Sequence, residues 1–510
     1  MTHSLNASNV VAVIGSGAMG SGIAQVAAAA GHTVKLFDAR PEAATKAVAD
    51  IRTVYGKLAD KGKMQPKDAD AAGKRLLAIS SLEDAKDAAL VVEAITENLD
   101  AKRGLFASLE NIVADDCILA TNTSSISVTA IGAKLRRPQR LVGMHFFNPV
   151  PLMALVEVVS GLATDRAVAE AIYSAAQAWG KSPVHAASTP GFIVNRVARP
   201  YYAEALRVAT EQGGNPATLD AIMREAGGFR MGPFELMDLI GHDVNFAVTS
   251  SVFAAYFNDP RFTPSLMQQE LVNAGFLGRK SGRGFYRYGE GEAAPQPDTE
   301  APRAKVGKVV VHGGGSIANT IAARLAAAGV EVVRQREAEK HVAGMEFDGV
   351  TVMLTDGRTA TQCAHDSRQA NTVLFDLALD YQTARRIALA PADQCSKEAY
   401  GSAVALFQSA GYAVSRLGDV PGMLVMRTVA MLANEAADAV NQGVCSAEAV
   451  DIAMQKGVNY PAGPLAWADA IGLPVIQTVL HHLAAVYGED RYRTSPLIQR
   501  KLAAGRTFHA

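Results

Sequence analysis

The sequence predicts an α/β fold in which a doubly wound sheet is followed by a helical domain, and this unit is present twice with a degenerate second copy. Three observations support this prediction. An apolar run at residues 9–14 leads into a glycine-rich turn and an alanine-rich helical stretch. Further apolar runs alternate with helical stretches until about residue 186. The same order of motifs returns after residue 305 in altered form.

The first motif predicts a dinucleotide site. The run at 9–14 is typical of a strand buried on both faces, and Gly15-Ser-Gly-Ala-Met-Gly20 follows it directly. Gly15 permits a tight turn, Gly17 lets the backbone approach a pyrophosphate, and Gly20 lets helix and strand pack closely. The next apolar run, 31–37, ends at Asp38, where a carboxylate can bind both ribose hydroxyls. Asp38 favours NAD over NADP because its charge repels a 2′-phosphate, although Arg40 stands nearby.

Further runs at 87–95, 117–121 and 140–144 read as strands and complete a Rossmann-type sheet. Helical periodicity dominates after residue 189, and residues 289–304 are polar and proline-rich. We therefore expect five successive segments, described from the N-terminus to the C-terminus. They are an NAD-binding domain at 1–186, a helical substrate and dimerisation domain at 187–288, a linker at 289–304, a degenerate Rossmann-like domain at 305–416 and a second helical domain at 417–510.

Spacing supports an internal duplication. Pro421-Gly repeats Pro190-Gly, and Gly463-Pro repeats Gly232-Pro, and both pairs are separated by 231 residues. Chance rarely preserves both a motif and its spacing.

Composition excludes some classes of partner. Lys and Arg total 49 and Asp and Glu total 50, so nothing favours nucleic acid or an anionic membrane. The four cysteines are widely spaced, which argues against disulfides and a structural metal site, and we expect no metal. With no secretory signal or membrane-length apolar run, a cytoplasmic protein is expected.

Several motifs together resemble 3-hydroxyacyl-CoA dehydrogenases. They are the glycine loop, Thr121-Asn-Thr-Ser-Ser125, Gly143-Met-His-Phe-Phe-Asn-Pro149, Leu155-Val-Glu-Val-Val159, Thr189-Pro-Gly-Phe-Ile-Val-Asn-Arg196 and Gly278-Arg-Lys-Ser-Gly-Arg-Gly-Phe-Tyr286. The likeness covers residues 10–288, and the full length resembles the long, duplicated form that includes the 3-hydroxyadipyl-CoA enzymes of phenylacetate breakdown. The implied reaction is the reversible NAD-dependent oxidation of an (S)-3-hydroxyacyl-CoA to a 3-oxoacyl-CoA, as in fatty-acid β-oxidation.

The resemblance implies a catalytic set. Oxidising a secondary alcohol needs a base, and histidine suits because its pKa lies near neutral pH. His145 is that base, and Glu157 orients its ring and stabilises the imidazolium. Ser124 binds the substrate 3-oxygen and Asn195 lies near the thioester. Taken without the family, His145 reads as a packed residue, Ser124 as a helix cap and Asn195 as a buried amide.

The resemblance also implies binding residues. The expected cofactor contacts are Gly15, Gly17, Ala18, Met19, Gly20, Asp38, Ala94, Glu97, Lys102, Ser124 and Asn148. Without the family, Glu97 and Lys102 read as charges on a helix surface. Among three lysines at an expected exposed helix end, Lys57, Lys61 and Lys63, Lys61 best matches a coenzyme A contact, although a solvated charged face explains the cluster nearly as well. Ala43 stands near the place where the family often has a glutamine.

Two other enzymatic readings and one structural reading stay open. A short-chain 3-hydroxybutyryl-CoA dehydrogenase uses the same motifs. A β-hydroxyacid or 6-phosphogluconate-type dehydrogenase shares the layout but relies on a catalytic lysine. A non-catalytic NAD-binding relative has no need for an intact Ser124, His145, Glu157 and Asn195.

The second copy is expected to carry no chemistry. The 231-residue spacing places Asp376 at the position of His145, Ala388 at that of Glu157, Leu379 at that of Asn148 and Met426 at that of Asn195. In the second glycine loop, Gly313 to Gly315, Ala318 replaces Gly20, and Arg336 falls at the position of Asp38. We expect residues 417–510 to pack on 187–288 as an internal pseudo-dimer, with further homo-oligomerisation open.

Overall fold

A computed structural model describes residues 5–509 apart from 294, 313–314 and 336–343, so Gly313 and Arg336 lie outside the described residues. The chain forms two compact units. The first contains Met1–Arg196 and Ala439–Val458, and the second contains Val197–Asp438 and Asn459–Ala510. The sequence pattern did not indicate that residues 439–458 join the first unit.

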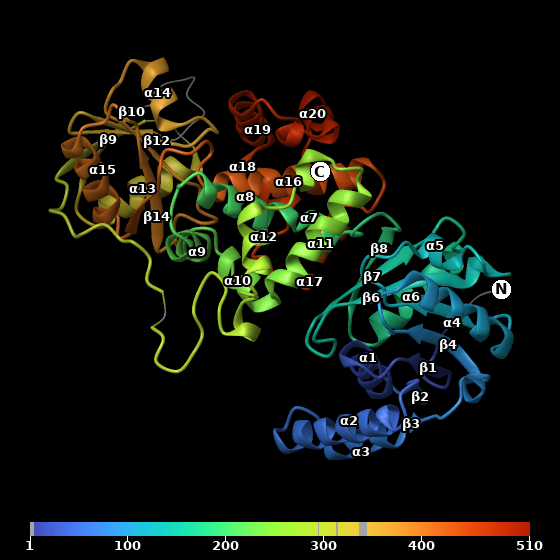
Figure 1. Ribbon diagram of the computed structural model, residues 1–510. Coiled ribbons are helices and arrows are strands. Elements are labelled where there is room, and N and C mark those ends of the chain that lie inside the picture. The colour runs from blue at the N-terminus through green and yellow to red at the C-terminus, as the bar shows by residue number, and fades with distance from the viewer. Residues whose placement is uncertain (1–4, 294, 313–314, 336–343, 510) are drawn as a thin grey trace. The chain divides into compact units, whose positions relative to one another are not determined.

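The first unit is built on an eight-stranded sheet with the order β3-β2-β1-β4-β5-β6-β7-β8 (Figure 1). The strands are β1 Val10–Ile14, β2 Val34–Phe37, β3 Leu76–Ala78, β4 Ala88–Glu93, β5 Ile118–Thr121, β6 Leu141–Phe146, β7 Leu155–Ser160 and β8 Ser182–Ala187. The first six strands of this order run parallel, and β7 is antiparallel to β6. This is the doubly wound arrangement that places ligands at the carboxyl ends of the parallel strands.

The strands form because their apolar residues can be buried on both faces. Val11, Val13, Leu90 and Val92 are fully buried, as a parallel sheet covered by helices requires. The helices of this unit are α1 Ala18–Ala29, α2 Ala43–Asp60, α3 Pro66–Lys74, α4 Leu99–Ile112, α5 Val128–Gly132, α6 Arg166–Ala178, α7 Val194–Val197 and α17 Ala447–Gly457. Figure 1 shows α2 lying alongside α3.

Helix α17 comes from the second half of the sequence but packs on β7 and β8 of the first sheet. The backbone N–H of Ala187 donates to the carbonyl of Val444 at 2.8 Å. Gly457 lies so close to Leu155 that a Cβ on the glycine would be 2.5 Å from the leucine side chain. The sheet that carries Glu157 is therefore covered partly by the second copy.

The second unit contains a seven-stranded mixed sheet with the order β10-β9-β11-β12-β13-β14-β15. Its strands are β9 Lys308–His312, β10 Glu331–Gln335, β11 Gly344–Phe347, β12 Val350–Leu354, β13 Thr372–Phe375, β14 Arg386–Pro391 and β15 Ala413–Arg416, and its associated helices are α13 Ser316–Ala327, α14 Ala360–Ser367 and α15 Lys397–Ser409. Strand β11 is antiparallel to both of its neighbours, so this sheet departs from the parallel order of the first.

The remaining helices of the second unit come from both halves of the sequence. They are α8 Arg199–Thr210, α9 Pro216–Glu225, α10 Pro233–Ile240, α11 His242–Ala255, α12 Leu266–Asn273, α16 Val425–Asn441, α18 Pro464–Ile471, α19 Leu473–Tyr487 and α20 Pro496–Ala503. Buried ion pairs join the halves, since Arg427 pairs with Glu204 at 2.6 Å and Arg261 pairs with Glu435 at 3.1 Å. The two helical regions therefore pack on each other within one chain.

The spacing of 231 residues also relates whole elements in the later part of each copy. It relates β7 to β14, α6 to α15 and α10 to α18, and each pair has matching ends. Each copy contributes a helix that packs on the sheet of the other copy. Helix α9 of the first copy packs beside β14 of the second sheet, where Arg386 pairs with Glu225 at 3.1 Å, while α17 covers the first sheet.

No single helix among the described residues has both the length and the apolar composition to cross a membrane. Within that part of the chain, α18 and α19 taken together meet those criteria, but they are bent by 100° relative to each other.

Candidate active site

The glycine loop between β1 and α1 has the geometry that a pyrophosphate needs. Gly15 has φ +107°, and a Cβ there would lie 2.4 Å from the carbonyl oxygen of Ala94. A Cβ on Gly20 would lie 1.8 Å from the carbonyl oxygen of Gly15. A Cβ on Gly17, by contrast, would meet nothing within 4 Å, so this backbone faces open space at the start of α1. Two glycines are therefore fixed by packing and the third leaves room for a ligand, which fits NAD.

Asp38 follows β2 and lies beside this loop. Its Oδ2 accepts hydrogen bonds from the backbone N–H of Ser16 at 2.9 Å and from the Ser16 hydroxyl at 2.7 Å. Arg40 donates from Nε to Oδ1 and from Nη2 to Oδ2, both at 3.0 Å. The Arg40 guanidinium holds the pKa of Asp38 well below its usual range, so the carboxylate is charged.

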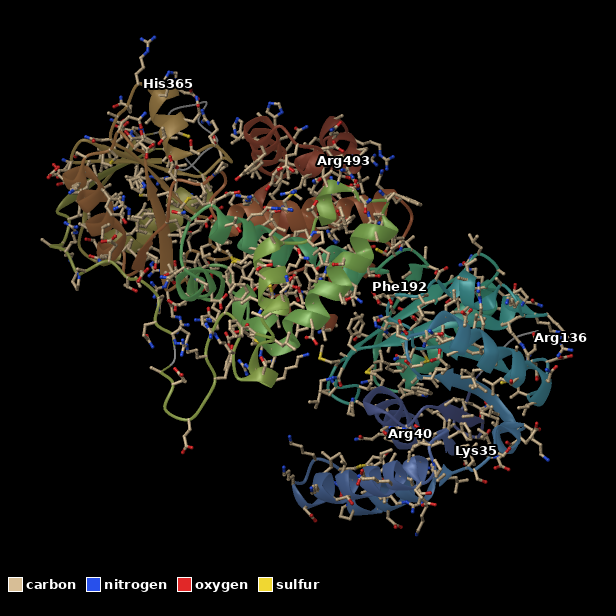
Figure 2. All side chains as sticks on the ribbon, viewed as in Figure 1. Lys35, Arg40, Arg136, Phe192, His365 and Arg493 are labelled. Carbon is tan, nitrogen blue, oxygen red and sulfur yellow. The ribbon has the colours of Figure 1, made fainter. Side chains whose placement is uncertain are left out.

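A cavity of about 430 Å³ opens between α1, α2 and the loop 148–151. Arg40, labelled in Figure 2, lines it together with Lys46 and Ala43. Asn148 and Pro149 line its other side and are joined by a cis peptide bond. The expected cofactor residue Asn148 is thus exposed at the edge of this cavity.

His145 and Glu157 are brought together by the antiparallel pairing of β6 and β7. The two residues are direct partners in the register, so their side chains project from the same face of the sheet. His145 Nδ1 lies 2.6 Å from Glu157 Oε2. Both side chains are buried, with exposed fractions of 7% and 0%. A carboxylate at Nδ1 favours the tautomer in which Nδ1 carries the proton and Nε2 is free to accept one.

Glu157 is itself fixed by the backbone. Its Oε1 accepts from the N–H groups of Ile193 at 3.0 Å and Val194 at 2.9 Å, at the start of α7. The carboxylate therefore joins the sheet to the segment that carries Asn195. This hydrogen-bonded arrangement leaves Glu157 one orientation toward the histidine.

Two aromatic rings lie against the imidazole, and neither was among the residues predicted for the site. Phe147 and Phe192 have ring centroids 4.5 Å and 5.8 Å from that of His145. Phe192 has φ 46°, in the left-handed region that a bulky residue rarely adopts. Its motif, Pro-Gly-Phe, was visible in the sequence, but the backbone strain could be seen only in the structure.

Ser124 and Asn195 are close to one another. The side-chain amide of Asn195 donates to the Ser124 carbonyl at 3.4 Å. Glu97 Oε1 accepts from the Ser124 backbone N–H at 3.0 Å and from the Thr123 hydroxyl at 2.6 Å. Glu97 thus orders the loop after β5 that presents Ser124.

Lys102 corrects one reading of the sequence. Its side chain is 1% exposed, so it is not a charge on a helix surface. The ammonium group pairs with Glu93 at 2.6 Å and with Glu97 at 3.2 Å. Glu93 ends β4 and was not predicted to take part. Periodicity could not reveal this site because the lysine reaches its partners from the inward face of α4.

The expected coenzyme A contact is the least defined residue of the set. Lys61 follows the last residue of α2, and it is exposed together with Lys57 and Lys63. Their exposure agrees with the predicted helix end and leaves the role of Lys61 a prediction.

The described residues of the second copy contain no such dyad at the corresponding positions. Asp376, at the position of His145, is fully buried, and its oxygens accept from the N–H groups of Leu424, Val425 and Met426. Ile193 and Val194 occupy the matching positions in the first copy, where they donate to Glu157. Asp376 therefore accepts the backbone hydrogen bonds that correspond to those accepted by Glu157 in the first copy. Ala388, at the position of Glu157, has no carboxylate.

Comparisons with known proteins show the family of this chain. Residues 10–189 match the model described as 3-hydroxyacyl-CoA dehydrogenase, NAD binding domain, and residues 191–288 and 422–509 match the corresponding C-terminal domain. Residues 352–421 match the 3-hydroxybutyryl-CoA dehydrogenase reduced Rossmann-fold domain.

Individual relatives cover either the whole chain or its first half. The chain is 44% identical to the 3-hydroxyadipyl-CoA dehydrogenase of Escherichia coli, over 96% of this chain and 97% of the relative. It is 41% identical to a probable 3-hydroxybutyryl-CoA dehydrogenase of Bacillus subtilis, over 55% of this chain and 97% of the relative. A solved structure described as 3-hydroxybutyryl-CoA dehydrogenase from E. coli is 42% identical with TM-score 0.88, covering 98% of this chain and 100% of that one.

Proposed function

The chain belongs to the family of NAD-dependent 3-hydroxyacyl-CoA dehydrogenases, and we propose that its substrate within that family is 3-hydroxyadipyl-CoA, which it oxidises to the 3-oxoacyl thioester. The observation that carries the reaction is the buried His145–Glu157 pair, which lies on the same sheet as a glycine loop that fits NAD. The named relative that matches almost the full length supports the dicarboxylic substrate.

In the proposed mechanism, His145 is the base that accepts the proton of the substrate hydroxyl. NAD held at the glycine loop and Asp38 would supply the acceptor for the hydride from C3 of the substrate. His145 Nε2 takes the hydroxyl proton as the C3–O bond becomes a carbonyl, and Glu157 stabilises the imidazolium through Nδ1. Phe147 and Phe192 exclude water from the imidazole. In the reverse direction the same histidine returns the proton.

The other predicted site residues are assigned to substrate and cofactor binding. Ser124 hydrogen-bonds the 3-oxygen and Asn195 lies near the thioester, with their loops joined by the contact between them. The cofactor cradle is formed by Gly15, Gly17, Ala18, Met19, Gly20 and Ala94. Asp38 holds the ribose end of the cofactor and Asn148 its nicotinamide end. Glu97, paired with Lys102, fixes the loop after β5 that carries Ser124. Lys61 contacts coenzyme A.

A 3-hydroxybutyryl-CoA dehydrogenase is the second candidate, because the E. coli relative and the E. coli solved structure, both matched over nearly their full length, are described with different substrates. Steady-state kinetics with NAD and an acyl-CoA panel decides between them. A clear preference in kcat/KM for unsubstituted short or medium chains would refute the dicarboxylic assignment. No turnover with any member of the panel would refute the enzymatic one.

The reciprocal packing also supports a structural role for the second copy. We propose that the two halves form an internal pseudo-dimer, in which α9 and α17 each cover the sheet of the other copy. Linking the halves makes this docking intramolecular and so independent of protein concentration. The cytoplasmic location, the place in phenylacetate breakdown and any further homo-oligomerisation stay predictions.

A further inference from the structure

Helix α17 ends at Gly457, and this glycine has no room for a side chain. A Cβ on it would lie 2.5 Å from Cδ2 of Leu155 and 3.2 Å from Cγ2 of Val194. Both neighbours are themselves buried, with exposed fractions of 0% and 2%. A close-packed interior cannot take up an added methyl group unless the atoms around it move. A side chain at residue 457 would therefore displace Leu155, Val194 or both.

Leu155 and Val194 are also neighbours of the catalytic carboxylate. Leu155 precedes Glu157 by two positions on β7, so the two side chains project from the same face of the sheet. The backbone N–H of Val194 donates to Glu157 Oε1 at 2.9 Å. Glu157 Oε2 in turn lies 2.6 Å from His145 Nδ1. A displacement that starts at Gly457 would therefore reach the imidazole through Glu157.

The start of α17 is held to the same sheet. The N–H of Ala187, the last residue of β8, donates to the carbonyl of Val444 at 2.8 Å. Ser446 then caps the helix, because its hydroxyl accepts from the N–H of Ala449 at 3.1 Å. The helix packs on both β7 and β8. It therefore cannot move away from the sheet to make room for a larger residue at its end without losing these contacts.

The corresponding position of the first copy has a different residue. The 231-residue spacing places Ala226 at the position of Gly457, directly after α9, which packs beside β14. Ala226 is 2% exposed, so the second sheet accommodates a Cβ at this point. Arg386 stands at the position of Leu155, and its side chain pairs with Glu225. A glycine therefore ends the helix over the first sheet, which carries the dyad, and an alanine follows the helix over the second sheet.

We propose that Gly457 is a positioning residue, which lets Leu155 and the N–H of Val194 approach closely enough to hold the Glu157 carboxylate against His145. This inference rests on the proposed function, because it uses the role of Glu157 in stabilising the imidazolium. It goes beyond that function, because Gly457 belongs to the second copy, which then helps to set the turnover rate of the first. Gly457 acts through Glu157 and takes no part in hydride or proton transfer.

The test is a double-mutant cycle in the full-length chain. Wild type, Gly457→Ala, Glu157→Gln and the double variant are assayed with NAD and with 3-hydroxyadipyl-CoA and 3-hydroxybutyryl-CoA. Urea unfolding and NADH titration on the same samples show which variants are folded and bind cofactor. Gly104→Ala is the matched control, because it adds the same methyl group to an exposed glycine of α4, where a Cβ would meet no described atom within 4 Å.

We expect Gly457→Ala to lower kcat roughly 10- to 100-fold, since a small misplacement of a catalytic group has an effect of this size. The KM for the acyl-CoA and the Kd for NADH should change less than about threefold, because the loss arises at the dyad. In the Glu157→Gln background the same substitution should lower kcat by a further factor of less than about two, because the carboxylate through which it acts is already gone. Gly104→Ala should leave kcat unchanged.

Two results overturn the inference. One is a Gly457→Ala enzyme within about threefold of wild-type kcat, and the other is an equal loss of kcat with and without Glu157→Gln, which indicates a general packing effect. If Gly457→Ala does not fold, Val194→Ala takes its place, because it removes a side chain at the same contact and keeps the N–H. No loss of kcat in that variant, or an equal loss in both backgrounds, overturns the inference in the same way. Wild type that turns over neither substrate refutes the proposed function instead.

Discussion

Glu157→Gln separates the orienting role of this residue from its structural one. In the wild type, Oε2 faces His145 Nδ1 at 2.6 Å and Oε1 accepts two backbone N–H groups. Glutamine keeps the size and one oxygen. If that oxygen stays on the Ile193 and Val194 N–H groups, the amide NH₂ faces Nδ1. Nδ1 must then accept, the ring proton moves to Nε2, and the histidine can no longer act as a base.

The expected magnitudes follow from those contacts. Fixing the wrong tautomer should lower kcat by about 10³–10⁴-fold, the scale seen when a triad carboxylate becomes an amide. Stability should change by about 1 kcal/mol or less, because volume and both backbone hydrogen bonds survive. Glu157→Ala should also lose about 2–4 kcal/mol of stability, since it leaves two buried N–H groups unpaired and opens a cavity.

The assay follows NADH absorbance under steady state, with urea unfolding and NADH binding measured on the same samples. Asp376→Asn is the matched control, because Asp376 also accepts from the backbone N–H groups that begin a helix but has no histidine beside it among the described residues. It should lower stability while kcat of the folded enzyme stays within about threefold of wild type. A Glu157→Gln enzyme within about tenfold of wild-type kcat would refute the tautomer argument.

Four further predictions use other contacts. His145→Ala should lower turnover by roughly 10²–10⁴-fold with NADH binding nearly intact, and near-normal turnover would remove it from the mechanism. Asp38→Ala should weaken NADH binding and relax discrimination against NADPH, because it removes the charge beside the glycine loop and releases Arg40; unchanged affinity in a titration would contradict the assignment. Burial raises the pKa of Asp376 to about 6, so the folded chain binds this proton more tightly than the unfolded chain. Its contribution to stability should therefore fall as pH rises from about 4 to about 6, and Asp376→Asn should lack that component in urea unfolding, where an unchanged pH slope would count against it. A chain ending at residue 288 loses α17 from the first sheet and should aggregate or dimerise in sedimentation experiments, whereas a stable, active monomer would show that the second copy is dispensable.

For the His145–Glu157 pair, the local sequence predicted the two strands, and the tertiary structure determined how the side chains meet. Strand patterns placed His145 and Glu157 on successive strands, and the turn between them allowed an antiparallel pairing. The register that makes them direct partners, at 2.6 Å, depends on hydrogen bonds along both strands. Burial of Lys102 and the strained backbone of Phe192 also depend on packing, so no periodicity could indicate them.

The Rossmann-type fold, the NAD-binding loop, the family and the duplication could all be predicted from the chain alone, because each is encoded in short motifs or fixed spacings. Which copy covers which sheet became visible only after folding. Helices α9 and α17 have amphipathic patterns that fit any apolar sheet surface, and the choice between them depends on complementary shapes far apart in sequence. Local sequence specifies secondary-structure elements and motifs. The burial of a side chain and the residues it contacts depend instead on segments that are far apart in the sequence and meet only in the fold.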